Sequence, residues 1–172
     1  MHLLALLLLL PLADGFDFPV GPPDGTGYYD AQPFGGRRAH LGSDWNGNGG
    51  GNSDLGDPVF AIAAGRVVET TDVGGGWGNV VRVVHRVRAP GGGEQLVESL
   101  YAHLDTIDVA AGTLVQRGER LGTIGTAGGT YVVHLHLEVR DRPGRPLGPG
   151  YGEPDGQVDA TAFIAARRPV SR

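Results

Sequence analysis

The chain has 172 residues, a formal net charge of −5 and no cysteine, and all fourteen of its basic residues are arginine. The lack of cysteine excludes disulfides, thiolate catalysis and cysteine-ligated zinc, and the lack of lysine excludes Schiff-base chemistry and a biotinyl- or lipoyl-lysine. Because the chain is mildly acidic and has no basic stripe, we do not expect it to bind nucleic acid.

The N-terminal segment 1–15 is predicted to be a signal peptide. An apolar run from Leu3 to Leu12 is interrupted only by Pro11. A run of about ten residues has the length of a signal-peptide core and is too short for a membrane span of roughly 20. Residues 12–15 form the predicted cleavage zone. We therefore expect a protein that is secreted or periplasmic, without stable insertion into a membrane.

The rest of the chain is rich in glycine and proline, with 31 and 12 residues respectively, which favours short strands joined by tight turns. Residues 16–36 are predicted to be an extended approach to the domain, and residues 44–57 a loop dense in glycine and asparagine. Strands are predicted at 59–63, 65–70, 79–85, 95–104, 113–115, 120–125 and 132–140, and one short helix at 160–167. This pattern predicts an all-β domain, either an antiparallel sandwich or a partly open barrel.

The pair His134 and His136 is the first indication of a metal site. Side chains alternate along a strand, so the two imidazoles share one face while their apolar neighbours point to the other. His40 and Asp44, four residues apart, can supply two ligands from one strand end and its loop, and His136 the third. Two imidazoles and one carboxylate suit catalytic zinc, because Mg²⁺ and Ca²⁺ prefer shells of oxygen alone.

The segment from Asp44 to Gly49 also matches the start of a calcium-binding loop. The twelfth position of such a loop needs a bidentate glutamate, and here it is Leu55, so we interpret the segment as a flexible groove wall. Trp45, Trp77 and Tyr101 are each expected either to line the cleft or to pack in the core.

Two further histidines lie in predicted strands. His103 alternates with Ala102 and Leu104, so its side chain is expected to leave the strand face toward a site instead of entering the core. His85 lies outside every motif and is expected to be structural or exposed.

Three motifs occur in order: H-x-x-x-D at 40–44, Y-A-H-L at 101–104 and H-L-H-x-E at 134–138. Together with residues 57–68, 75–79 and 115–122, they resemble the M23 zinc metallopeptidases, the lysostaphin/LytM-type peptidoglycan endopeptidases. The resemblance implies a peptidase domain over 37–168 with a fold of the duplicated-hybrid-motif type and a groove formed by glycine-rich loops. It implies that His40, Asp44 and His136 bind one zinc ion per chain, with His103 and His134 beside the zinc-held water.

The resemblance also implies an activity, which is zinc-assisted hydrolysis of peptide cross-links in bacterial peptidoglycan by a monomeric, exported enzyme. Either His103 or His134 would accept the proton of the attacking water, and the other would stabilise the tetrahedral intermediate or protonate the leaving amine. Glu138 lies on the same face as the histidines. The family pattern implies that it is a supporting carboxylate that orients an imidazole, rather than a general base.

Two other classes of protein share features with this sequence. Relatives of this fold that have lost metal ligands suggest a non-catalytic cell-wall-binding or amidase-activating module. The presence of all five candidate site residues favours the enzyme. A biotinyl or lipoyl carrier is suggested by the hairpin-like segment 112–125, and the absence of lysine excludes it.

Overall fold

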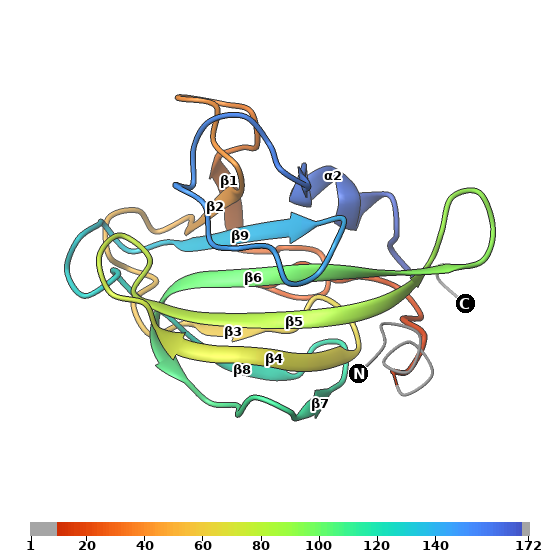
Figure 1. Cartoon of the computed structure of the whole chain (residues 1–172). Helices are drawn as coiled ribbons and strands as arrows, with labels where there is room; N and C mark the ends of the chain where they lie inside the picture. The colour runs from red at the N-terminus through yellow and green to blue at the C-terminus, as the bar shows by residue number, and fades with distance from the viewer. Residues whose placement is uncertain (1–9, 170–172) are drawn as a thin grey trace.

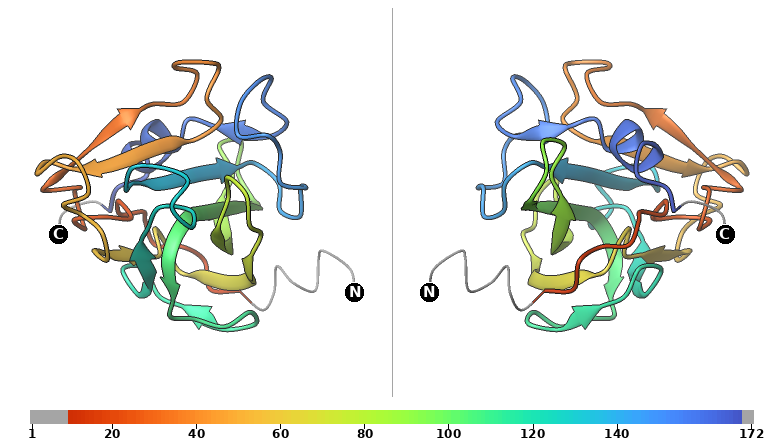
Figure 2. Two further views of the ribbon diagram at one scale, coloured as in Figure 1. Left: turned by 90° about the vertical axis from the view of Figure 1, so that its left-hand side faces the viewer. Right: turned by 90° about the vertical axis from the view of Figure 1, so that its right-hand side faces the viewer.

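The computed structural model describes residues 10–169, so most of the predicted signal peptide, residues 1–9, lies outside the described part. Among these described residues, ten strands form one antiparallel sheet that curls around a core without closing (Figures 1 and 2). This confirms the predicted all-β, partly open architecture. Within residues 10–169, no helix has the length and apolar character needed to cross a membrane.

The sheet is built around two long central strands, β5 and β6. The strands are β1 (Tyr28–Gln32), β2 (Ser43–Gly47), β3 (Pro58–Phe60), β4 (Gly65–Asp72), β5 (Asn79–Arg88), β6 (Glu94–Ile107), β7 (Leu114–Val115), β8 (Arg120–Ile124), β9 (Leu135–Arg140) and β10 (Gln157–Val158). Their order is β1-β2-β9-β6-β5-β4-β7, with β10 beside β9, and β8 beside β3 and β6. The predicted helix is α2 (Ala160–Ala165), which begins where the Asp159 side chain accepts a hydrogen bond from the Ala162 N–H.

The inner face of the sheet carries the main hydrophobic core. Leu135, Leu137 and Val139 of β9 are fully buried in it. Because side chains alternate along a strand, His136 and Glu138 point to the opposite, outer face. The alternation of apolar and functional residues predicted for this segment is therefore confirmed, although the regular strand begins at Leu135.

Strand β2 corrects the prediction of a loop over residues 44–57. Its outward positions are the polar Asp44 and Asn46, while Trp45 is buried in the core, and the strand pairs with β1 and β9. Polar outward residues and the following glycines concealed the strand from sequence reasoning. Trp45 and Tyr101 are core residues, which decides between the two alternatives for each.

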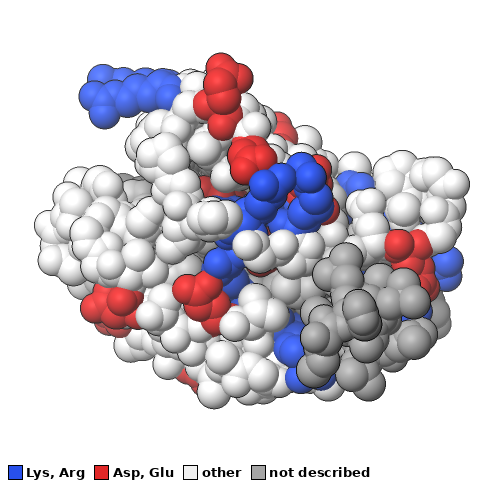
Figure 3. Space-filling view, viewed as in Figure 1, with Lys and Arg blue, Asp and Glu red and all other residues white. Residues whose placement is uncertain are grey.

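The segment 16–36, predicted as an extended approach, contains strand β1 and places Phe16 and Val20 in the core. Before it, Leu10 packs against Val84 and Leu96. Figure 3 shows acidic and basic side chains interspersed over the described residues of one face.

His85 is the centre of a buried polar group in the core. Its Nδ1 lies 3.0 Å from the carbonyl oxygen of Ala64, and its Nε2 lies 2.7 Å from Ser99 Oγ. Ser99 Oγ is 3.1 Å from Tyr101 Oη, which accepts the N–H of Ile62. Of the two alternatives for His85, the structural one is correct.

This burial predicts a loss of stability in acid. Burial lowers the pKa of His85 from 6.5 to about 4, so below pH 6.5 the unfolded chain binds a proton that the folded protein does not. At about 1.4 kcal/mol per unit of pKa, His85 is expected to remove about 3 kcal/mol of unfolding free energy between pH 7 and pH 4. Urea unfolding of metal-free protein across this range should show a steeper decline for wild type than for His85→Gln. Equal declines in the two proteins would contradict this role.

Candidate metal centre and active site

Three side chains meet where β2 pairs with β9. Asp44 lies directly opposite His136 in the antiparallel register, and His40 lies just before β2. Asp44 Oδ1 is 2.9 Å from His136 Nδ1 and 3.3 Å from His40 Nε2, and the two nitrogens are 3.1 Å apart. Within residues 10–169, this is the group of histidine and carboxylate side chains whose ligand atoms lie close enough to share one metal ion.

The surroundings fix which nitrogen each of the two imidazoles presents to the centre. His40 Nδ1 is 2.9 Å from the carbonyl oxygen of Gln32, and His136 Nε2 is 3.3 Å from Glu138 Oε1. When a metal ion replaces the protons on the inward nitrogens, donation from these outer nitrogens would leave the lone pairs of His40 Nε2 and His136 Nδ1 directed at the centre. Gln32 Nε2 also donates to Asp44 Oδ2 at 3.3 Å. Such supporting hydrogen bonds are typical of histidine metal ligands.

The protonation states of the group are set by burial and by close partners. Burial opposes ionisation of Asp44, but hydrogen bonds from His136 and His40 outweigh it and hold the Asp44 pKa well below its ordinary value. Burial also opposes the charge on His136, and the carboxylates of Asp44 and Glu138 outweigh it, raising the His136 pKa to about 9. The carboxylates of Asp44 and Glu138 therefore favour positive charge at the centre of this group.

His103 and His134 lie beside this group at the base of a pocket of about 430 Å³. Their ring centroids are 4.7 Å apart, and His134 Nε2 is 3.8 Å from Asp44 Oδ1. Each Nδ1 faces a backbone carbonyl, that of Trp77 at 3.3 Å for His103 and that of Val132 at 2.8 Å for His134. Donation from Nδ1 leaves each Nε2 free for a reacting group. All five predicted site residues thus share one site, while their roles stay predictions.

The direction of the His103 side chain is not the one that simple alternation along β6 predicts. Tyr101 is buried in the core, so an unbroken strand would turn His103 to the core as well. Instead, the β5–β6 register slips between the pairs Asn79↔Leu104 and Val81↔Tyr101, and His103 has φ of 64°. This bulge turns its side chain to the outer face. The predicted direction is correct, but the reason given by alternation is wrong.

The environment of His103 keeps its imidazole neutral. Burial and the neighbouring rings of His136 and His134 lower its pKa to about 3. At neutral pH the imidazole is therefore neutral, and its Nε2 has a lone pair available.

The pocket walls are aromatic and come from segments that lie far apart in the sequence. The residues around the metal group are Gln32, Gly76, Trp77, Tyr131, Val132, Pro149, Gly150 and Tyr151. Trp77 is thus a pocket residue. Sequence reasoning missed Gln32, Tyr131 and Tyr151 because none belongs to a motif or follows a strand period that points at the histidines.

No residue of the segment 45–54, which is predicted as a groove wall, is among those that line the pocket. The segment supports the site from behind. Asn46 Nδ2 donates to the carbonyl oxygen of Val133 at 2.9 Å, and Asn52 Oδ1 accepts the Val133 N–H at 3.0 Å. Asp54 accepts the N–H of Gly47 at 3.0 Å, so these side chains tie the segment down.

Gly42 is required by the close approach of a metal-site residue. A Cβ at this position would lie 2.6 Å from His136 Cε1 and 2.7 Å from the carbonyl oxygen of Leu137. We expect Gly42→Ala to displace the imidazole and weaken zinc binding by about tenfold or more, the range seen when a ligand loses its support. Competition with a chelator measures the affinity. Gly91→Ala, where a Cβ meets open space, is the matched control. Equal affinities in the two variants would contradict the contact.

Metal-dependent hydrolases are the class of protein for which such a centre is typical. Within this class, the chain belongs to peptidase family M23, whose family model matches residues 38–149. The resemblance noted from the motifs is therefore confirmed.

Three of the proteins that this chain resembles are longer than the chain itself. It is 35% identical over 134 residues to the DD-carboxypeptidase/endopeptidase Mpg of Neisseria meningitidis, covering 76% of this chain and 27% of Mpg. The chain thus spans about a quarter of that relative. Lysostaphin from Staphylococcus simulans shares the fold, with a TM-score of 0.57 at 24% identity over 80% of this chain and 48% of that chain. A zinc-containing peptidase from Vibrio cholerae gives 0.51 at 25% identity over 85% and 39% of the two chains.

Proposed function

We propose that this protein is an exported zinc metalloendopeptidase that hydrolyses peptide cross-links of bacterial peptidoglycan. The observation that carries the proposal is the group of His40, Asp44 and His136, with His103 and His134 next to it at the base of one pocket. Ligands without accompanying acid–base groups would suit a structural metal, whereas this arrangement provides both.

Zinc is the metal that the donor set fits. Two imidazole nitrogens and one carboxylate oxygen match catalytic zinc sites, which keep a fourth position open. The hydrogen bonds from the outer nitrogens orient the rings of His40 and His136, so that their inward nitrogens can ligate a metal once each gives up its proton. The similarity to a zinc-containing peptidase supports this choice. When bound, zinc supplies Lewis acidity toward the scissile carbonyl and the attacking water.

The chain's own residues perform the proton transfers. His103 and His134 present their Nε2 atoms on the open side of the metal group, where one accepts the proton of the attacking water. The other donates a hydrogen bond to the developing oxyanion or a proton to the leaving amine. Glu138 accepts a hydrogen bond from His136 on the side away from the pocket, so it acts as a supporting carboxylate and not as the base.

The family and the pocket both support a cell-wall peptide as the substrate. Mpg, the relative named above, is a DD-carboxypeptidase/endopeptidase. The pocket of this chain is open and walled by Trp77, Tyr131 and Tyr151, which suits an extended peptide passing across the centre. Peptidoglycan lies outside the cytoplasmic membrane, so this function requires export, in agreement with the apolar leader. We propose that the enzyme acts as a monomer.

Digestion of purified sacculi by the zinc-loaded protein tests this proposal. Chromatography and mass analysis of the muropeptides should show cross-linked dimers converted to monomers, and the masses identify the bond that is cut. Binding to sacculi with unchanged muropeptides would instead favour a non-catalytic wall-binding or amidase-activating module, and would overturn the proposed activity.

A further inference from the structure

Behind the metal group, four charged side chains are buried on the outer face of β5, β6 and β9. This ion cluster consists of Arg82, Glu98, Glu138 and Arg140. Glu98 lies opposite Arg140 in the β6–β9 register, and both are 0% exposed. Burying two charges costs more free energy than most ion pairs return, and apolar residues often give equal stability. Stability alone therefore does not explain the cluster.

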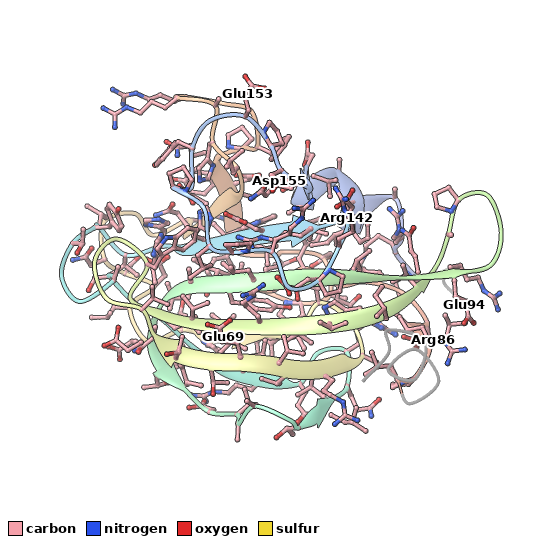
Figure 4. The ribbon with its side chains drawn as sticks, viewed as in Figure 1. Glu69, Arg86, Glu94, Arg142, Glu153 and Asp155 are labelled. Carbon is pink, nitrogen blue, oxygen red and sulfur yellow. The ribbon has the colours of Figure 1, made fainter. Side chains whose placement is uncertain are left out.

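The charges alternate in sign from the metal group outward. His136 Nε2 lies 3.3 Å from Glu138 Oε1, and Arg140 Nε donates to Glu138 Oε2 at 2.8 Å. Arg140 Nη1 is 3.9 Å from Glu98 Oε1, which accepts from Arg82 Nε at 3.0 Å. Arg82 Nη1 in turn donates at 2.8 Å to Glu69, labelled on β4 in Figure 4.

The ion cluster also holds the segment that covers it. Residues 141–151, here called the strap, leave the end of β9 and double back across the sheet (Figure 1). The Gly144 N–H donates to Glu98 Oε2 at 3.0 Å. The carbonyl oxygen of Arg145 accepts from Arg82 at 2.8 Å and from Arg140 at 3.2 Å. These bonds fix the backbone of the strap to the outer face.

The far end of the strap forms a wall of the active-site pocket. The carbonyl oxygen of Gly150 accepts the N–H of Leu41 at 2.9 Å. The ring of Tyr151 lies 5.4 Å from that of His40, and Tyr151 Oη is 3.4 Å from Gln32 Nε2. The same buried charges therefore contact Glu138, which supports a metal ligand, and the strap backbone a few residues before the pocket wall.

We propose that Glu98 and Arg140 are positioning residues for peptide hydrolysis. They hold the strap so that Tyr151 forms one wall of the substrate site, and through Glu138 they fix the ring of His136. The inference rests on the proposed function for its effect on catalysis, but the placement of the strap and of the imidazole is independent of activity.

Glu98→Gln tests this role, because it removes the charge and nearly preserves the shape. We expect the strap amides, including that of Gly144, to exchange hydrogen faster, and zinc affinity to fall by about tenfold. With zinc saturating, KM for a cross-linked muropeptide should rise about tenfold while kcat changes less than about threefold, because the wall and not the reacting groups is displaced.

Arg117→Gln is the matched control, since it removes an ion pair with Asp17 that belongs to no part of the site. A merely structural role predicts that both variants lower the melting temperature while strap exchange, zinc affinity and KM stay at wild-type values, and this result would overturn the inference. If Glu98→Gln does not fold, Arg82→Lys provides a second variant. It keeps the positive charge, but a lysine cannot make the several hydrogen bonds of Arg82 to Glu98 and to the carbonyl oxygen of Arg145. Strap exchange, zinc affinity and KM are measured in the same way. Faster strap exchange and weaker zinc binding in a protein that hydrolyses no peptide would refute the proposed function and uphold the positioning role.

Discussion

His136→Ala is expected to abolish tight zinc binding and to reduce peptide hydrolysis to background, because it removes one of three ligands. Loss of a mere supporting partner costs about 10–100-fold in metal affinity, so loss of a ligand should cost more. The fold should persist, since the neighbours Leu135 and Leu137 fill the core from the opposite face. Metal analysis, turnover and the β-sheet circular dichroism signal together test these three points.

His85→Gln is the control for this experiment, since it alters a buried histidine that contacts no residue of the metal group. It should retain one zinc ion per chain at neutral pH. Undiminished zinc in His136→Ala would show that the ligand set is wrong. Collapse of the sheet signal on chelation of wild-type zinc would contradict the expectation that the core of this domain is stable without metal.

His103→Ala and His134→Ala are expected to keep zinc and lose most activity. Neither side chain belongs to the three-residue ligand group, but each presents a free Nε2 toward the open side of the site. General acid–base groups contribute about 10²–10⁴-fold, so kcat should fall by a factor in this range in each variant. Zinc stoichiometry and turnover are measured on the same samples.

The result of these two variants separates the possible roles. Near wild-type turnover in either variant would remove that histidine from the mechanism. Loss of zinc from either would move it into the ligand set. Glu138→Gln gives a useful comparison, because a supporting carboxylate predicts weaker zinc binding with turnover largely restored at saturating zinc, whereas a general base predicts lost turnover at any zinc concentration.

The parts of the site that the sequence predicted are those with a short, regular spacing. The apolar residues Leu135 and Leu137 indicate the buried face, so the alternation predicts that His134 and His136 share the other face. His103 was less accessible to this reasoning, since its direction depends on a bulge whose register slip arises between two strands. A single strand's pattern carries no signal for such a slip.

The parts that the sequence did not predict depend on contacts between distant segments. Strand β2 offers few apolar residues and is held by pairing on both sides. Tyr151 enters the pocket because the strap before it is tied to buried charges more than forty residues away, such as Glu98. The structural role of His85 depends on contacts with Ala64 and Ser99, which lie 21 and 14 residues away in the sequence. In each case the interaction that determines the structure joins residues far apart in the sequence, and no periodic pattern of residues predicts it.

The most direct test of the central claim is a zinc titration of metal-free protein with release of new amino groups from a cross-linked muropeptide as the readout. The account predicts that release is absent without metal, rises in proportion to added zinc and stops rising at one equivalent per chain. Release that is independent of zinc, or no release at any zinc concentration from protein that has bound one equivalent, would contradict it.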